Sequence, residues 1–306
     1  MPAPSILLLG ASGYLGVPLL AEFLTHRSKF SRLAILTDES RKHKFEDAKA
    51  KGVELIIGSY LEPDSFKGFN TVLSLLGNHA MADQPSIIKA CLAAKVTEFY
   101  PSEFGGDSSQ GPYVTNRYFD EKNKTRAFLA ETVAKNPDSG FNYTLIMCGG
   151  FMEYVMNPIF GGDEESETFT FYGSGEKREP FTSVADVCRY TVASTLMPKS
   201  PSGARSFKIP EAWYTWSEVI STISRASGVE YKPIFLPNEE AVEKAKQFKE
   251  SGDADGELTF SLKALIGSLG FEAVPEPWDN DKFPEIVPVN LETALKQYFA
   301  KSKPEV

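Results

Sequence analysis

The sequence lacks the features of a secreted or membrane protein. It has three cysteines in 306 residues, an odd number that excludes a complete disulfide framework, and their spacing matches no metal site. No apolar stretch approaches the roughly 20 residues that a membrane helix requires. The first residues carry no charged and apolar leader with a cleavage pattern. We therefore expect a cytoplasmic protein with no membrane partner and no metal ion.

Basic residues are also scarce. Lysine and arginine together number 32 against 41 aspartates and glutamates, which gives a net charge of -9. This balance argues against nucleic acid as the main partner, because phosphate backbones are bound by concentrated positive charge. A small-molecule substrate is the remaining expectation, and the composition leaves a homo-oligomer open.

Short apolar runs alternate with helical patterns along the first half of the chain. The runs are typical of strands buried on both faces of a parallel sheet, and they cover residues 5–10, 33–36, 53–57, 71–76, 98–100 and 142–147. Helical spacing covers residues 17–24, 41–51, 87–94 and 118–135. This alternation predicts an α/β fold with a doubly wound parallel (Rossmann) sheet and right-handed crossovers.

The pattern weakens after about Gly149. We predict a dinucleotide-binding Rossmann domain over residues 1–150, to which residues 181–200 return. Residues 151–306 are then mainly a smaller, less regular C-terminal substrate lobe. Within it, three further helices are predicted at 184–196, 216–227 and 239–250, and segments around 158, 163–167 and 173–175 are predicted as loops. The acidic and polar stretch 249–257 is predicted as a mobile loop.

Glycines punctuate the turn after the first predicted strand, in the sequence Gly10-Ala-Ser-Gly13-Tyr-Leu-Gly16. Such spacing is a weak signal alone, but a buried strand precedes it and a helix follows. The first glycine permits a tight turn, the second lets the backbone approach a pyrophosphate, and the third lets helix and strand pack closely. The helix N-terminus offers N–H groups to the phosphates. The loop therefore predicts nicotinamide dinucleotide binding, and the alternative is a plain strand-to-helix turn. The expected cofactor contacts in it are Gly10, Ser12, Gly13, Tyr14, Leu15 and Gly16.

A second motif, Phe99-Tyr-Pro-Ser-Glu-Phe-Gly105, gives the chain a family resemblance. With the glycine loop it resembles the isoflavone reductase-like branch of the NmrA-like, atypical short-chain dehydrogenase/reductase family. The likeness extends through 84–90, 122–126, 181–187 and 283–290 and so covers essentially the whole chain, with 235–278 matching worst. It implies an NADPH-dependent reductase of phenylpropanoid-type aromatics. Another branch of the family implies a dinucleotide-sensing regulator without catalysis.

The residues after the second predicted strand bear on the choice of cofactor. Members of the family commonly carry a basic residue there for the 2′-phosphate of NADPH, whereas this chain has Asp38. An acid at this point ordinarily binds the ribose diol of NAD. Arg41 and Lys42 follow closely and could meet the phosphate instead, or could simply be solvated. We expect NADP(H), with NAD(H) left open by Asp38. Further expected cofactor contacts are Gly77, Lys122, Cys148 and Phe151.

Tyr118 and Lys122 are the main catalytic candidates. Their i, i+4 spacing places a phenol and an ammonium on one face of a predicted helix. A nearby cation lowers the pKa of a tyrosine, which can then exchange a proton with substrate near neutral pH. The resemblance implies a catalytic role for Lys122 but not for Tyr118, which could be a packing aromatic. Ser102, after a strand, could bond the substrate oxygen or cap the turn.

Four further side chains are predicted to contact the substrate: His79, Phe104, Met152 and Tyr154. Solvation of the histidine and core packing of the others are the alternatives. The predicted function is NAD(P)H-dependent reduction of a carbonyl or activated double bond of a small, aromatic secondary metabolite. The alternatives are a dinucleotide-sensing regulator without turnover and a non-redox dehydratase or isomerase on the same scaffold.

Overall fold

The computed structural model describes residues 3–268 and 272–302. Contacts between Cα atoms divide the chain into two compact units. Unit 1 comprises residues 1–104, 121–146 and 187–207, and unit 2 comprises residues 105–120, 147–186 and 208–306. These units are defined by contacts and each combines separate segments of the chain. The domains predicted from the sequence, 1–150 and 151–306, are continuous segments and stay a prediction.

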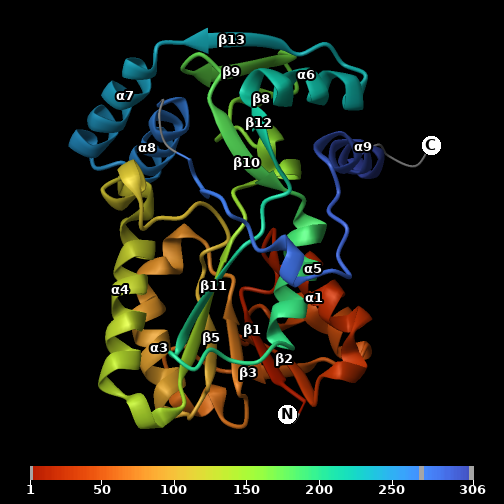
Figure 1. Ribbon diagram of the computed structural model, residues 1–306, viewed down its shortest axis with the longest axis vertical. Helices are drawn as coiled ribbons and strands as arrows, with labels where there is room; N and C mark the ends of the chain where they lie inside the picture. Colours follow the sequence, from red (N-terminus) through yellow and green to blue (C-terminus); the bar gives the residue numbers. More distant parts are fainter. Residues whose placement is uncertain (1–2, 269–271, 303–306) are drawn as a thin grey trace. The chain divides into compact units, whose positions relative to one another are not determined.

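Unit 1 is built on a seven-stranded sheet with the order β11-β6-β5-β4-β1-β2-β3 (Figure 1). The strands are β1 (Ser5–Leu9), β2 (Arg32–Thr37), β3 (Glu54–Ile57), β4 (Thr71–Ser74), β5 (Glu98–Tyr100), β6 (Asn142–Met147) and β11 (Ala204–Lys208). Every pairing from β3 across to β6 is parallel. The predicted doubly wound sheet is confirmed. The strand order reverses direction between β1 and β4, which is where such sheets place a ligand, outside the carboxyl ends of the strands.

Helices cover both faces of this sheet, so the central strands can be apolar throughout. Figure 1 shows α3 and α4 on one side and α1 on the other. The helices are α1 (Gly16–Thr25), α2 (Glu46–Ala50), α3 (Gln84–Ala93), α4 (Asp120–Lys135) and α5 (Val184–Thr195), which belongs mainly to this unit. Leu7, Val72 and Phe99 of the strands pack in one core with Ile87 of α3 and Leu129 of α4. The helix predicted over 41–51 is instead a 3-10 turn, Lys42–Phe45, followed by the short α2.

Unit 2 contains two three-stranded sheets, with the orders β12-β10-β7 and β13-β9-β8. Their strands are β7 (Gly150–Phe151), β8 (Gly162–Asp163), β9 (Thr168–Tyr172), β10 (Arg178–Thr182), β12 (Ala212–Thr215) and β13 (Lys232–Leu236). The core centres on Trp216, whose ring lies 5.1 Å from that of Phe171 and 5.6 Å from that of Phe181. Strand β8 therefore overlaps the first residue of the loop predicted over 163–167, and β9 lies between that loop and the one predicted over 173–175.

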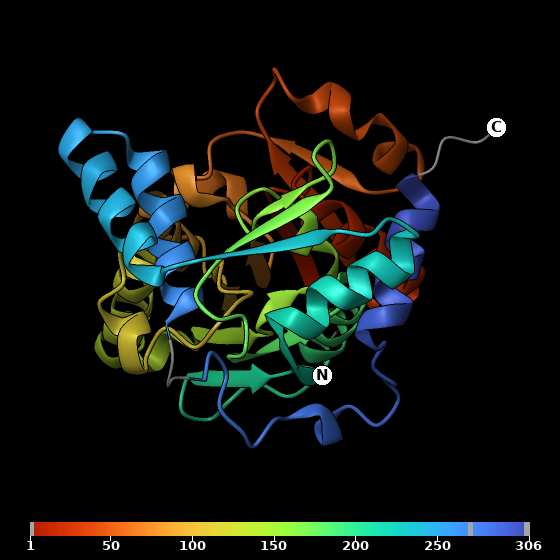
Figure 2. The same cartoon turned by 90° about the horizontal axis from the view of Figure 1, so that it is seen from above.

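The helices of unit 2 are α6 (Trp216–Ser227), α7 (Asn238–Ser251), α8 (Ala254–Gly267) and α9 (Leu291–Ser302). The mobile loop predicted over 249–257 is wrong, because α7 and α8 form a tight helical hairpin across it (Figure 2). Gly252 turns the chain at φ +77°, and the Asp253 side chain accepts a hydrogen bond from the Gly256 N–H (2.9 Å), which caps α8. Across the described parts of the chain, no helix is long and apolar enough to cross a membrane.

Candidate cofactor and catalytic site

The glycine loop joins β1 to α1 in the geometry that a pyrophosphate site requires. Gly10 adopts φ +77°, and a Cβ there would lie 2.8 Å from the Leu75 carbonyl oxygen of the neighbouring strand connection. A Cβ on Gly16 would lie 2.4 Å from the Gly10 oxygen, so only glycine lets α1 start this close to the loop. The Gly13 N–H donates to the Gly10 oxygen (3.0 Å). Ser12, Gly13 and Tyr14 are exposed at the loop surface, whereas Leu15 is buried and anchors the loop.

A cavity of about 450 Å³ lies beside this loop, within unit 1. It is bordered by the segments that follow β1, β2 and β3 and by the end of the β4 segment. The lining residues are Leu9, Gly10, Ala11, Ser12, Leu36, Thr37, Asp38, Glu39, Arg41, Phe45, Ile57, Gly58, Ser59, Tyr60, Leu61 and Leu76. All these strands are parallel, so their carboxyl ends meet here, and the lining combines glycine backbone with apolar side chains such as Leu36 and polar ones such as Asp38. Such a cavity fits the adenosine half of a dinucleotide.

The charged rim of this cavity distinguishes Arg41 from Lys42. The Asp38 carboxylate accepts hydrogen bonds from the Ser40 hydroxyl and from the Arg41 N–H (3.1 Å), and it lies 3.6 Å from Arg41 Nε. The Ser40 hydrogen bond is the main reason that the pKa of Asp38 is lowered. Arg41 lines the cavity, whereas Lys42 lies outside the lining and forms an ion pair with Glu39. Of the two predicted phosphate ligands, Arg41 alone borders the cavity.

Residues 58–60 form a wall that the sequence reasoning missed. Gly58, Ser59 and Tyr60 follow β3, and Tyr60 donates a hydrogen bond to Asp83 Oδ2 (3.1 Å). Burial and the neighbouring Asp83 raise the pKa of Tyr60. Their position in the sequence could have indicated this role, because they follow the third parallel strand as Asp38 follows the second.

Ser102 holds the ends of two neighbouring strands together. Its hydroxyl donates to the Leu76 carbonyl oxygen (2.7 Å), and its N–H donates to Oε1 of the fully buried Gln84 (2.8 Å). Gly77 follows Leu76 directly and is exposed. The Ser102 hydroxyl hydrogen is therefore engaged with the backbone of the β4 segment. This arrangement fits the structural alternative, in which Ser102 shapes the turn, and it sets the position of Gly77.

Lys122 is fixed against the motif that follows β5. It lies on α4 with only 7% of its surface exposed, and its Nζ donates to the Glu103 carbonyl oxygen (2.5 Å). The Glu103 carboxylate is itself buried and lies 2.7 Å from Nη2 of Arg126, one helical turn beyond Lys122. The sequence reasoning did not assign Glu103 or Arg126 this supporting role. Their charge and the i, i+4 spacing of Lys122 and Arg126 were the signals available.

Tyr118 lies just before the helix that carries Lys122. It is in a 3-10 turn, Arg117–Phe119, and α4 begins after it at Asp120. The Asn116 side chain accepts the Tyr118 N–H (2.9 Å) and caps this turn. Tyr118 is half-buried, and its ring packs edge-on against Phe119. The pairing of Tyr118 with Lys122 stays a prediction.

The remaining predicted residues divide between the two units. In unit 1, His79 is exposed in the 3-10 turn Asn78–Asp83, and Phe104 is partly buried at φ +32°, a conformation unusual for a residue with a side chain. In unit 2, Cys148 and Met152 are fully buried, Met152 in the Trp216 core. Phe151 and Tyr154 are partly buried there. The burial of Met152 is what its packing alternative predicts.

The sheet order, the glycine loop and the adjoining cavity together define the architecture of a dinucleotide-binding Rossmann protein. Residues 2–261 match the model of the NmrA-like family, and the chain belongs to that family. The family resemblance carried by the two sequence motifs is thus confirmed.

Known proteins are similar to this chain over 70% to 97% of its length. A phenylcoumaran benzylic ether reductase of Betula pendula, Betv6, is 25% identical, with 96% of this chain and 98% of the relative covered. An isoflavone reductase of Cicer arietinum is 26% identical over 70% of this chain and 69% of the relative. Leucoanthocyanidin reductase from Vitis vinifera, solved as a binary complex with NADPH, has a TM-score of 0.75 at 18% identity, with 97% of this chain and 99% of that chain covered. This last likeness shows the fold.

Proposed function

We propose that the protein is an NADPH-dependent reductase of a carbonyl or activated double bond in a small aromatic secondary metabolite. The observation that carries the proposal is the cavity at the carboxyl ends of β1, β2 and β3, closed on one side by the glycine loop. The names of the relatives support the substrate class, since both are reductases of aromatic compounds.

We assign the predicted residues distinct roles toward this cofactor. Backbone N–H groups of the loop 10–16 and the first turn of α1 would hold the pyrophosphate. Asp38 would border the adenosine ribose, and Arg41 would meet the 2′-phosphate as a charge-assisted donor. When bound, the cofactor supplies a hydride. Gly77, Cys148 and Phe151 are proposed for the nicotinamide end. His79, Phe104 and Tyr154 are proposed for the substrate, whereas the fully buried Met152 packs in the Trp216 core.

Lys122 is the proposed catalytic residue. Its Nζ is held by the Glu103 carbonyl oxygen, and Arg126 in turn holds the Glu103 carboxylate, so the ammonium is oriented before any ligand binds. In this proposal the ammonium, which has three N–H donors, meets a ribose hydroxyl or a substrate oxygen when the ligands bind. Ser102 acts as a positioning residue through Leu76. Tyr118 is kept as a secondary candidate for proton transfer.

The decisive experiment compares Lys122→Ala with the matched variant Lys124→Ala. Lys124 lies on the same helix but is exposed and pairs with Glu121. We expect Lys122→Ala to lose at least 100-fold in turnover, within the usual range for positioned acid–base catalysis, while NADPH still binds. Lys124→Ala should keep wild-type rates. The measurement is NADPH oxidation with isoflavones and phenylcoumarans, together with NADPH titration by fluorescence.

Three results would contradict the proposal. Full activity in Lys122→Ala would remove this lysine from the chemistry. Tight NADPH binding without turnover on any aromatic ketone, enone or benzylic ether tried would favour the dinucleotide sensor. Product formation without NADPH consumption would instead indicate non-redox chemistry on the same scaffold.

A further inference from the structure

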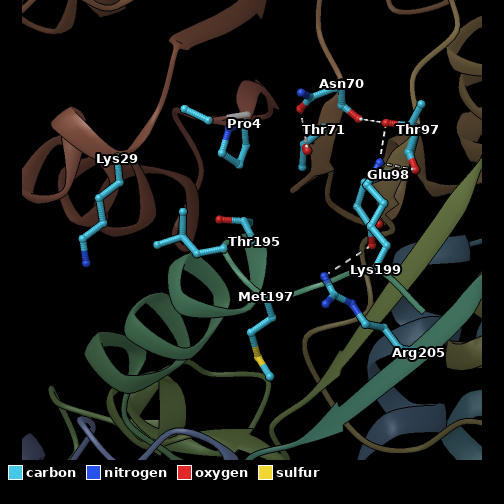
Figure 3. A pocket seen from close by; sticks show the side chains of 12 residues that line it. Pro4, Lys29, Asn70, Thr71, Thr97, Glu98, Thr195, Met197, Lys199 and Arg205 are labelled. Carbon is cyan, nitrogen blue, oxygen red and sulfur yellow. Dashed lines mark hydrogen bonds and ion pairs between the residues drawn. The ribbon is translucent and has the colours of Figure 1, made fainter. Parts of the chain in front are cut away.

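A second cavity, of about 550 Å³, lies at the opposite edge of the unit 1 sheet (Figure 3). It is bordered by the residues before β1, the first residues of β4 and β5, the segment after α5, and Arg205 of β11. We call it the amino-edge cavity, because it lies at the amino ends of β1, β4 and β5. The glycine-loop cavity lies at the carboxyl ends of the parallel strands, so the two cavities are separate sites. Nothing in the proposed reductase chemistry uses the amino-edge cavity.

Glu98, the first residue of β5, is the unusual group in this cavity. Only 3% of its surface is exposed. Its Oε1 accepts a hydrogen bond from the Thr144 hydroxyl and lies 3.6 Å from Arg205 Nη2. Its Oε2 is buried and has no hydrogen-bond partner among the residues that the structure describes. A buried acceptor left without a donor costs about 1–3 kcal/mol, so such atoms in native proteins usually meet a ligand or water.

The cations around Glu98 give the cavity a positive balance. Lys29, Lys199 and Arg205 line it against the single carboxylate of Glu98, in a chain whose net charge is -9. Figure 3 shows Lys199 and Arg205 close to Glu98. The Arg205 guanidinium is held by hydrogen bonds to Thr144, Pro198 and the buried Tyr100 hydroxyl, so its position is fixed without a ligand.

Glu98 and Lys199 differ in their surroundings. Burial raises the pKa of Glu98 despite the Thr144 hydrogen bond and the Arg205 charge. Lys199 is exposed, and its Nζ donates to the Thr97 carbonyl oxygen (3.0 Å) and to the Thr97 hydroxyl. A ligand would therefore supply Glu98 with the missing hydrogen bond and Lys199 with a counter-charge.

We propose that the amino-edge cavity binds a small organic anion that carries a hydroxyl group. The anionic group faces Lys199, and the hydroxyl donates its hydrogen to Glu98 Oε2. The volume lies within the usual range for small-molecule sites. The anion can be a carboxylate or a phosphate monoester, since an ammonium binds both as a point charge. This inference is independent of the proposed reductase activity.

The test uses pairs of probes that differ in hydroxyl groups. Malate and succinate form the carboxylate pair, and glycerol 3-phosphate and propyl phosphate form the phosphate pair. Calorimetric titration of the full chain should show at least one hydroxylated probe binding about tenfold or more tightly than its partner, since about 1.4 kcal/mol corresponds to tenfold. The pair that shows the difference identifies the kind of anion.

Variants assign the binding to this cavity. Lys199→Met should weaken the binding of both members of the preferred pair, because it removes a cation. Glu98→Gln should abolish the preference for the hydroxylated member. Lys67→Met, at an exposed ion pair with Asp64, is the matched control and should change nothing. Thermal unfolding verifies that each variant is folded. No binding of either hydroxylated probe at millimolar concentration, or equal affinities within both pairs, overturns the proposal, as does binding that Lys199→Met and Glu98→Gln leave unchanged.

Discussion

Gly13 and Gly16 belong to the same loop, but their surroundings give them different tasks. A Cβ on Gly16 would meet Gly10 and Ala11 backbone at 2.4–2.7 Å, whereas a Cβ on Gly13 would meet only the Gly10 oxygen, at 3.3 Å. We expect Gly13→Val to keep the fold and lose at least tenfold in NADPH affinity, because the side chain occupies the place of the pyrophosphate. Fluorescence titration and circular dichroism measure the two effects.

The control for this prediction is Gly16→Val, which should destabilise the whole chain because it forces α1 away from the loop. If Gly13→Val binds NADPH and NADH as the wild type does, the loop is only a turn.

Arg41 and Lys42 differ in their access to the cavity, and this difference predicts the determinant of cofactor choice. Arg41→Ala should weaken NADPH binding by about 1–3 kcal/mol, the range for charge-assisted hydrogen bonds, and leave NADH nearly unchanged. Lys42→Ala should change neither affinity, because Lys42 lies outside the lining and pairs with Glu39. Titration of both variants with both cofactors decides the point. A wild-type preference for NADH would instead identify Asp38 as a ribose ligand.

Single residues were predictable where their role depends on nearby sequence. Gly16 approaches the backbone of Gly10 and Ala11, so the motif alone indicated its task, whereas the approach of Gly10 to Leu75 depends on the strand order. Spacing alone does not show where a helix starts, and here the Asn116 side chain caps the chain before Tyr118 while α4 begins at Asp120. The contact between Ser102 and Leu76 joins residues 26 positions apart and follows only from the strand order.

At the scale of elements, prediction succeeded where periodicity was local. Helix α6 begins and ends at the predicted residues, and its capping box at Thr215 and Glu218 is a short-range signal. Strand β13 was missed because it is largely exposed, contains Pro233 and pairs with β9 across some sixty residues. Strand β9 does alternate threonine with phenylalanine, a local strand pattern that the sequence prediction overlooked. The α7–α8 turn was missed because its polar composition also suits a loop.

The helical hairpin α7–α8 depends on one close approach. A Cβ on Gly256 would lie 2.4 Å from ring atoms of Phe248, which in turn stacks on Phe260 at 5.3 Å. We expect Gly256→Leu to destabilise the protein by about 1–3 kcal/mol through overpacking, measured by urea unfolding. Gly77→Leu is the control, because a Cβ there meets nothing within 4 Å. Equal stability of the two variants would show that the hairpin tolerates separation.

At the scale of the whole molecule, stability should depend on pH through Glu179. This carboxyl is buried in unit 2 and lies 2.7 Å from the buried Lys177 ammonium. Burial outweighs the attraction of Lys177 and raises the pKa of Glu179 to about 7. Folded protein thus retains a proton that the unfolded chain releases near its ordinary pKa of 4.5. The stabilisation is complete below that value and is lost as pH rises through about 7.

The expected loss is on the order of 1–3 kcal/mol between about pH 4.5 and pH 8. Urea unfolding across this interval measures it, and Glu179→Gln should flatten the profile because the amide does not titrate. A Glu179→Gln profile that still falls as steeply as the wild-type one would assign the pH dependence to other groups.

The two units differ in how far they could be predicted as wholes. Unit 1 is built from parallel strands whose continuous apolar runs, such as Ile6–Leu9, can be recognised one by one. Unit 2 gathers short strands from separate parts of the chain around Trp216, so its sheets exist only after long-range pairing. In unit 2 the sequence therefore predicted single helices such as α6 but not the sheets.

The chain passes from one unit to the other after residues 104, 120, 146, 186 and 207. During synthesis, therefore, the first hundred residues leave the ribosome with five strands of the unit 1 sheet, but they wait for α4, β6 and finally β11 before that sheet has all its strands. Until then the edge of β5, and later that of β6, lacks a partner strand. A truncated fragment ending near residue 150 would carry the same exposed edge permanently, which makes it prone to aggregate rather than to fold as a free cofactor-binding domain.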